Sequence, residues 1–225
     1  MNWLVTGALA EDAAGAGEMT WLQGAVAKFT ETPPEAWIVF GVILLAGILL
    51  LAGSRGGKRN ARIAGYGLVA IALSFVLSCI TLYRMPDGGS VTAASMLPVM
   101  LFAAACGVGP GFLAGLLYGV LQAMQGGILA IGAGPLILDY LLPFGLLCLA
   151  GLAKELPESW GIYPSIVAAA LARILCHTMA GVQFWETATM ASFEYNITYL
   201  GPDTVICILL AFLIAKPVIR FIRQR

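Results

Sequence analysis

Charged residues are scarce in this chain, and their scarcity excludes most classes of soluble protein. Of the 225 residues, 11% are charged and 60% are hydrophobic, and the mean hydropathy is +0.91. In soluble domains, about a quarter of the residues are charged. Twelve basic and twelve acidic residues balance one another, whereas a nucleic-acid surface needs a concentrated basic excess. The composition therefore predicts an all-α integral membrane protein, with the lipid bilayer and no nucleic acid as a partner.

The chain also lacks the motifs of common catalytic and metal sites. It contains no Walker A motif, no GxSxG motif and no His/Glu cluster at metal-ligand spacing. Its five cysteines form no CxxC pair and lie in or beside apolar runs, which is typical of packing residues. The first residues lack the basic start and long apolar middle of a signal peptide, so we expect no cleavage there. We expect no enzyme, no cofactor, no metal site and no ATP hydrolysis by this chain alone.

Seven apolar runs are candidates for membrane spans, each of which needs about 20 residues. The runs cover residues 36–53, 63–83, 93–106, 110–127, 135–153, 163–185 and 199–219. The third run is short and is separated from the fourth only by Gly107, Val108 and Gly109, which predicts a tight helical hairpin. The first run contains nothing polar and precedes a basic linker. We therefore expect an N-terminal extension, residues 1–60, with one extra transmembrane helix, followed by a six-helix core, residues 61–225.

Basic residues in short loops predict the orientation, because they concentrate on the cytoplasmic side. They occur before the second run, after the fifth run and in the C-terminal tail, which alternate as one side of the membrane. These residues are Arg55, Lys58, Arg59, Arg62, Lys154, Lys216, Arg220, Arg223 and Arg225. The acidic start of the chain and the other loops fall on the opposite side. The pattern predicts a multi-pass cell-membrane protein with its N-terminus outside and its C-terminus in the cytoplasm.

Asp139, with Tyr140 beside it, stands near the outer end of the fifth run. A carboxylate within a membrane is costly unless it is paired or faces a wet cavity. Two interpretations stay open at this point. Asp139 is either an acid near a helix N-terminus, where the macrodipole favours it, or a counter-charge for a cationic or amine-bearing ligand.

His177, the one histidine, lies in the sixth run with Gly181 and Trp185 at helical spacing on the same face. The glycine between an imidazole and an indole predicts room for a flat ligand. A satisfied buried histidine and an interfacial tryptophan are the plainer alternatives. Arg173, one turn away near the membrane middle, needs a partner that the sequence does not name. Structural pairing within the bundle is the favoured interpretation of Arg173.

Asn196 returns toward the membrane from the same predicted outer side, and its amide offers both a donor and an acceptor. Asp139, His177, Trp185 and Asn196 thus face one side of an otherwise apolar chain. Their convergence predicts a small-molecule binding pocket. The Gly-Gly in RMPDGGSVTAASMLP fits a loop that approaches a ligand, or an ordinary turn.

Five segments, in this order, resemble a known family. They read YRMPDGGSVTAASMLPVM, GFLAGLLYGVLQ, LDYLLPFGLLCLAGL, ARILCHTMAGVQFW and SFEYNITYL. Over about residues 61–220 they are similar to the thiamine-specific substrate-binding subunit of energy-coupling factor transporters. The resemblance implies a six-helix bacterial plasma-membrane protein that captures thiamine from outside. It also implies two kinds of partner, a transmembrane coupling subunit and a pair of cytoplasmic ATPase subunits.

The same resemblance implies roles for individual residues. The family's acid and following tyrosine fall on Asp139 and Tyr140, its histidine and helix-end aromatic on His177 and Trp185, and its asparagine on Asn196. The chain departs from some members at Ala191, where they have tyrosine, and at Gly89, where they have an aromatic. The family's small-residue surface for the coupling subunit falls on Ala70, Ser74 and Ser78, a stripe that equally fits internal packing.

Two other functions stay open on the residues alone. An autonomous ion-coupled carrier for a vitamin or small amine would use Asp139 and His177 as a proton relay. The lack of a convincing internal repeat weakens that hypothesis, because such carriers are commonly built from two repeats. A membrane enzyme acting on a lipid or isoprenoid would show clustered polar residues at the cytoplasmic face, which this sequence does not have.

Overall fold

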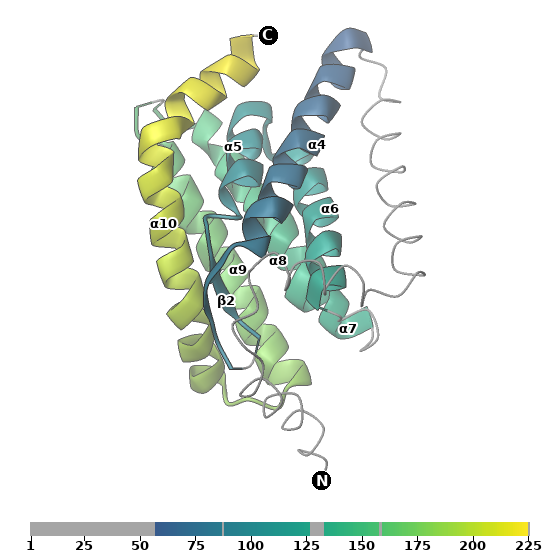
Figure 1. Cartoon of the computed structure of the whole chain (residues 1–225), viewed down its shortest axis with the longest axis vertical. Coiled ribbons are helices and arrows are strands. Elements are labelled where there is room, and N and C mark those ends of the chain that lie inside the picture. Colours follow the sequence, from purple (N-terminus) through teal and green to yellow (C-terminus); the bar gives the residue numbers. More distant parts are fainter. Residues whose placement is uncertain (1–56, 87, 127–132, 158, 225) are drawn as a thin grey trace, which may run out of the picture. The chain divides into compact units, whose positions relative to one another are not determined.

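A computed structural model describes residues 57–86, 88–126, 133–157 and 159–224. The expected first span, 36–53, therefore lies outside the described residues. The expected boundary of the N-terminal extension, at residue 60, lies at their edge. Helix α4, Gly57–Cys79, is followed by a hairpin of strands β1, Thr81–Arg84, and β2, Ser90–Thr92. Helices α5, Leu97–Cys106, and α6, Val108–Gly126, come next (Figure 1).

The second half of the chain forms three long helical segments. The first combines four stretches, α7, Ala133–Pro135, η3, Leu136–Leu141, α8, Leu142–Gly145, and η4, Leu146–Lys154. The others are α9, Ile162–Phe184, and α10, Thr189–Gln224. The predicted helical membrane core is confirmed, since these three segments and helix α4 of the first half are long and apolar enough to cross a bilayer. They are Asn60–Cys79, Ala133–Lys154, Ile162–Phe184 and Thr189–Gln224.

Helix α5 is shorter than the predicted span 93–106, because residues 93–96 form a turn after β2. Its ten residues measure about 15 Å, half of a hydrocarbon core. Eight of the ten are buried, since α4, α6, η4 and α10 all pack around this helix. The predicted hairpin with α6 is confirmed and turns at Gly107, whose φ of 106° is costly for any residue with a side chain.

Helix α6 packs closely against the segment that carries Asp139. A Cβ at Gly119 would lie 2.6 Å from the carbonyl oxygen of Tyr140, and one at Gly115 would overlap the carbonyl of Phe144. Only glycine allows this backbone approach. The small residues of α6 therefore set the position of the helix that presents the acid.

The stripe of small residues on α4 faces inward. Ala70, Ser74 and Ser78 are 6%, 0% and 6% exposed. The Oγ of Ser78 accepts a hydrogen bond from Gln122 Nε2 on α6, and the carbonyl of Ser74 accepts one from Tyr118. In this structure the stripe is thus an internal packing surface, the alternative that the sequence left open. Its predicted contact with a coupling subunit stays a prediction, and it would require α4 to move.

Helix α10 begins ten residues earlier than the predicted span 199–219. The segment before residue 199, expected as an outer loop, is helical from Thr189 onward. The 36 residues measure about 54 Å, well beyond a hydrocarbon core of about 30 Å. Helix α10 therefore has enough length to bring residues before position 199 into the bundle and to extend beyond the membrane at the other end.

Candidate ligand-binding site

Asp139 lies in the π-helical turn η3, within the composite segment Ala133–Lys154. The backbone N–H of Leu142 donates to Ile137 O, five residues back instead of the usual four. Pro143 explains the irregularity, because it has no N–H to donate to the carbonyl of Asp139. Single π turns inside α-helices are frequent at functional sites. Here the turn carries Asp139 and Tyr140 together.

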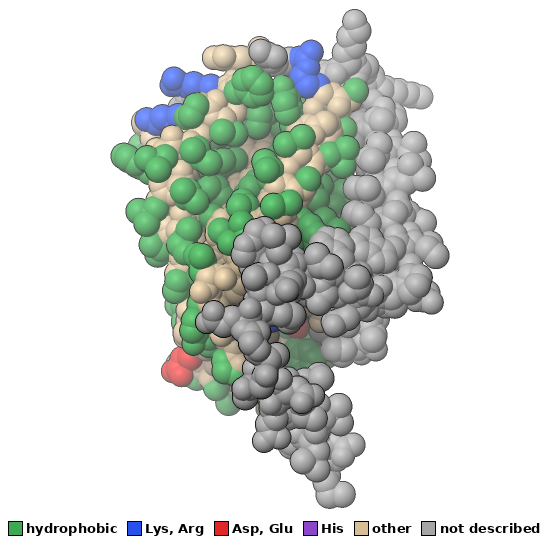
Figure 2. All heavy atoms as spheres, in the orientation of Figure 1, with side chains coloured by type: hydrophobic (Ala, Val, Ile, Leu, Met, Phe, Trp, Pro, Cys, Tyr) green, Lys and Arg blue, Asp and Glu red, His purple; other side chains and the backbone are tan. Residues whose placement is uncertain are grey.

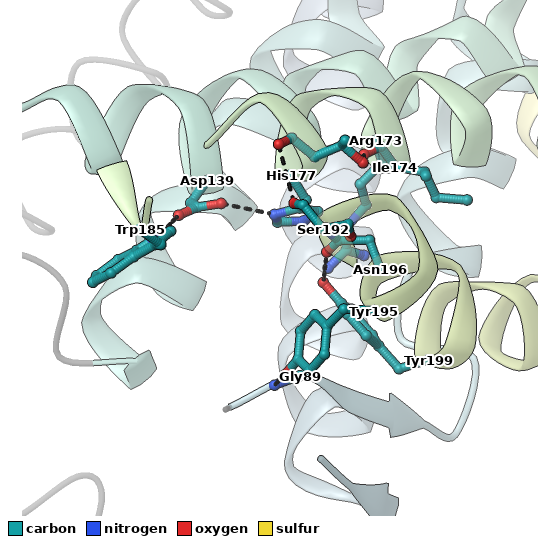
Figure 3. Close-up of polar contacts among 11 residues, drawn as sticks. Gly89, Asp139, Arg173, Ile174, His177, Trp185, Ser192, Tyr195, Asn196 and Tyr199 are labelled. Carbon is teal, nitrogen blue, oxygen red and sulfur yellow. Dashed lines mark hydrogen bonds and ion pairs between the residues drawn. The ribbon is translucent and has the colours of Figure 1, made fainter. Parts of the chain in front are cut away.

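The Asp139 carboxylate joins two side chains of α9. Its Oδ1 lies 3.1 Å from His177 Nδ1, and its Oδ2 accepts a hydrogen bond of 3.1 Å from Trp185 Nε1 (Figure 3). The side chains of His177 and Asp139 are 11% and 15% exposed, whereas Trp185 is 48% exposed. The acid is thus largely enclosed, with an exposed indole at its edge.

Arg173 completes a chain of contacts through His177. Its Nε donates to His177 Nε2 over 3.2 Å, so that nitrogen must carry the lone pair. The proton of a neutral imidazole then sits on Nδ1, where it points to Asp139. The Arg173 guanidinium also lies 4.1 Å from the centroid of the Phe144 ring, a cation–π contact. The predicted structural pairing of Arg173 therefore has His177 and Phe144 as its partners.

Asn196 lies on the other side of His177 from Trp185 (Figure 3). Its Nδ2 donates to Ser192 O over 2.8 Å, and its Oδ1 accepts from the hydroxyl of Tyr199 over 2.9 Å. The side chain is 5% exposed. Each amide atom keeps capacity for one more hydrogen bond, because Nδ2 carries two protons and Oδ1 two lone pairs.

Tyr140 is oriented away from its sequence neighbour Asp139. Its ring stacks on Phe144 with the centroids 6.4 Å apart, and its hydroxyl lies against Gly126 of α6. Among the described residues, no hydrogen bond joins its hydroxyl to Asp139. Tyr140 therefore forms part of the aromatic wall beside Arg173.

Gly181 does not provide the predicted room for a flat ligand between His177 and Trp185. A Cβ at this position would overlap Ser192 Oγ, so the space is filled by the first turns of α10. Ser192 Oγ donates to Thr178 O over 3.1 Å and fixes this approach. The glycine serves close packing of α9 on α10, which is its plainer role.

Gly89 lies where some family members are expected to have an aromatic, and tyrosine rings surround it. Its N–H donates to Tyr195 Oη over 2.9 Å, and a Cβ would lie 2.8 Å from the Tyr199 ring. Tyr195 and Tyr199 thus hold the β1–β2 hairpin against α10. Neither tyrosine was predicted as a site residue; Tyr195 precedes the predicted span 199–219, and Tyr199 is its first residue.

Known proteins resemble the described part of the chain. The model of a family described as "Thiamine transporter protein (Thia_YuaJ)" matches residues 64–222. Thiamine transporter ThiT of Bacillus subtilis (strain 168) is 29% identical in an alignment of 158 residues that covers 62% of this chain and 82% of that protein. A solved structure of ThiT from Listeria monocytogenes has a TM-score of 0.56 and 22% identity, over 71% of this chain and 93% of that one. The structural likeness supports the six-helix fold.

Proposed function

The chain belongs to the thiamine transporter family, and from this premise we propose that it captures thiamine at Asp139 as the substrate-binding subunit of an energy-coupling factor transporter. It is a multi-pass membrane protein and a transport protein rather than an enzyme. The observation that carries the proposal is the enclosed Asp139 carboxylate between His177 and Trp185.

The chemistry of thiamine matches this set of groups. Its thiazolium ring carries a permanent positive charge, and its aminopyrimidine ring is flat with hydrogen-bonding edges. Asp139 supplies the negative charge, and the half-exposed indole of Trp185 offers a π face to a cation. Asn196 has one donor and one acceptor position left for the pyrimidine edge. Tyr140 contributes to the aromatic wall.

Asp139 is suited to exchange partners on ligand binding. Both groups that hold it are neutral side-chain donors, so the carboxylate is hydrogen-bonded but no ion pair neutralises it directly. The nearest basic group in the network, Arg173, is separated from it by the imidazole. A cationic ligand therefore gains a charge that the protein leaves available within a poorly solvated site.

The partners that we propose are a transmembrane coupling subunit and two cytoplasmic ATPase subunits. The chain shows no Walker A motif, so energy from ATP has to come from other subunits. Loop charges support an orientation with the N-terminus outside and Asp139 toward the outer side. Capture outside and coupling to ATPases inside are then consistent with uptake.

The test is calorimetric titration of thiamine into the purified, detergent-solubilised chain. Saturable binding that weakens in Asp139→Asn, with no change in thermal unfolding, supports the proposed site. Glu194→Gln is a matched control, because it removes an exposed acid of α10. Absence of thiamine binding by the parent protein would remove the assigned ligand.

The direct contact between His177 and Asp139 also fits a proton relay in an autonomous carrier. Uptake measurements separate the two functions. An energy-coupling factor subunit copurifies with ATPase subunits and loses uptake when they are deleted. Uptake that persists without them, and that collapses when the proton gradient is dissipated, would favour the carrier.

A further inference from the structure

Arg173 stands apart from the basic side chains at the end of the molecule. On the face drawn in Figure 2, most of the visible Lys and Arg side chains gather at one end, above sides covered by hydrophobic groups. Arg173 instead lies in the middle of the 23-residue helix α9 and is partly buried. A charged residue in the middle of a membrane helix is costly unless it has partners, and such a residue commonly has a functional role. The contacts of Arg173 therefore indicate what its charge does.

The contacts of Arg173 hold one nitrogen of the His177 ring. Its Nε donates to His177 Nε2 over 3.2 Å, and its guanidinium carbon lies 4.1 Å from the centroid of the Phe144 ring. Arg173 and His177 are four residues apart on α9, so the helix itself keeps the two side chains adjacent. The other ring nitrogen, Nδ1, lies 3.1 Å from Asp139 Oδ1. The order along this row is a cation, a neutral ring and a carboxylate.

Nε2 is the position at which His177 would take up a second proton. A neutral imidazole has one nitrogen with a free lone pair, and the Nε–H of Arg173 occupies it. Protonation would require Arg173 to withdraw, and it would place two cations side by side. An imidazolium formed there would pair with Asp139 and neutralise its charge. Arg173 therefore keeps His177 a neutral donor.

Among the described residues, two charged groups act directly on His177, namely Arg173 from its own helix and Asp139 from η3. The elements α6, η3 and α10 bring further titratable groups toward Arg173, and these are Tyr118, Tyr140, Tyr199, Asp203 and Cys207. The phenols and the thiol are uncharged below about pH 7.5, because such groups titrate at about pH 8.5 or higher. Asp203 is bonded to Thr92. A measurement on the His177 ring itself separates its protonation from that of Asp203.

We propose that Arg173 is a positioning residue of the ligand site, an inference that rests on the thiamine binding proposed above. The Nε–H of Arg173 holds His177 as the neutral Nδ1–H tautomer, so that Asp139 keeps its negative charge for a cationic ligand. Arg173 acts through His177 and needs no contact with the ligand. The consequence is a thiamine affinity that changes little between about pH 7.5 and about pH 5.5, a range in which an ordinary histidine gains its charge.

The test first measures the tautomer of His177 directly. The chain contains one histidine, so nitrogen-15 labelling of histidine in the full chain, purified on a tag without histidine, gives one pair of ring-nitrogen NMR signals. We expect the pattern of the neutral Nδ1–H tautomer in the parent from about pH 7.5 to about pH 5.5. Arg173→Met removes the donor and the charge and leaves an apolar side chain beside Phe144. In this variant the ring should become an imidazolium over the same range.

Calorimetric titration of thiamine at the two pH values then measures the consequence for binding. The affinity of the parent should change less than about twofold. At about pH 5.5, one unit below the reference pKa of histidine, about ten of eleven freed imidazoles carry a charge, so Arg173→Met should bind thiamine about tenfold more weakly than at about pH 7.5. Arg62→Met is the matched control, because it makes the same change at an exposed arginine of α4 and should keep the profile of the parent.

Three outcomes would overturn the proposal. An Nε2–H tautomer in the parent would do so even if Arg173→Met did not fold. A folded Arg173→Met protein with an unchanged tautomer and a flat affinity profile would leave Arg173 as a packing partner only. A parent that shows the Nδ1–H tautomer but binds no thiamine would overturn the proposed function itself, and with it the role of Arg173 in that site.

Discussion

Among the described residues, two carboxylates lie within the bundle, and the protein holds them in different ways. Asp139 is 15% exposed and is held by two side chains, His177 and Trp185. Asp203 is 2% exposed, and its Oδ1 accepts from both the backbone N–H and the Oγ1 of Thr92, over 3.0 Å and 2.9 Å. The two hydrogen bonds of Asp203 fasten α10 to strand β2.

Under the proposed function, the difference separates a ligand group, Asp139, from a structural one, Asp203. Rotation of a side chain would free Asp139, and the half-exposed indole of Trp185 lies beside it. Release of Asp203 would leave the buried N–H of Thr92 without an acceptor, which costs about 1–3 kcal/mol. Under the proposed function, the same carboxylate chemistry would serve ligand recognition at Asp139, and at Asp203 it attaches the hairpin to α10.

The largest expected effect is on thiamine affinity when Asp139 loses its charge. Asp139→Asn should weaken binding by about 1.5–3 kcal/mol, or roughly ten- to a hundred-fold, because a hydrogen-bonded charge is lost from an enclosed site. Calorimetric titration measures the change. Thermal unfolding should shift little, and a comparable loss of stability would place Asp139 in the same structural class as Asp203.

Trp185 should contribute next, through its ring and its N–H. Trp185→Ala should weaken thiamine binding by about 2 kcal/mol, the value of a desolvated cation–π contact. Trp185→Phe keeps an aromatic face and loses the bond to Asp139, so its loss should be intermediate. Heat is the suitable signal, since tryptophan fluorescence changes with the substitution. Equal losses in both variants would assign the whole effect to the hydrogen bond.

Asp203→Asn makes the same change, aspartate to asparagine, at the attachment of the hairpin to α10. Thr92 then donates to a neutral acceptor, and charge-assisted hydrogen bonds are about twice as strong as neutral ones. We expect the free energy of unfolding to fall by about 1 kcal/mol and thiamine affinity to change less than twofold. Thermal unfolding in detergent gives the first value. A tenfold loss of affinity in a stably folded variant would contradict the division between the regions.

The hairpin has a second, weaker attachment that sharpens the comparison. Tyr195→Phe removes the acceptor for the Gly89 N–H, and we expect a cost of about 0.5–1 kcal/mol. Hydrogen exchange at Gly89 should accelerate roughly two- to fivefold, while exchange in α5 stays unchanged. Acceleration throughout the bundle would mean that this bond supports the global fold.

The sequence predicted the part of the site that stands out against apolar runs. Asp139, His177 and Trp185 are polar or amphipathic residues in hydrophobic helices, and the structure brings the three together. The roles of Tyr140 and Asn196 in ligand binding stay predictions. Likewise, the orientation and the coupling partners follow from loop charge and family resemblance, and stay proposals.

The first turns of α10 were missed because a polar segment beside a charged loop was interpreted as outer loop. Its two buried residues, Ser192 and Asn196, nevertheless continue the helical spacing of the buried residues of the predicted span, which are Tyr199, Asp203 and Cys207. Steps of three and four residues mark one helical face. That periodicity would have extended the predicted helix back toward Thr189. For the π turn at Asp139, the sequence offered a weaker indication, which is Pro143, four residues after Asp139.

The most direct measurement of the central claim compares two ligands with two proteins. Thiamine and an analogue whose thiazolium is replaced by an uncharged ring are each titrated into the parent and into Asp139→Asn. If Asp139 recognises the positive charge, the parent should prefer thiamine by about 1.5–3 kcal/mol, and the variant should bind both ligands with similar affinity. An Asp139→Asn variant that loses the same affinity for the charged and the uncharged ligand would contradict the claim.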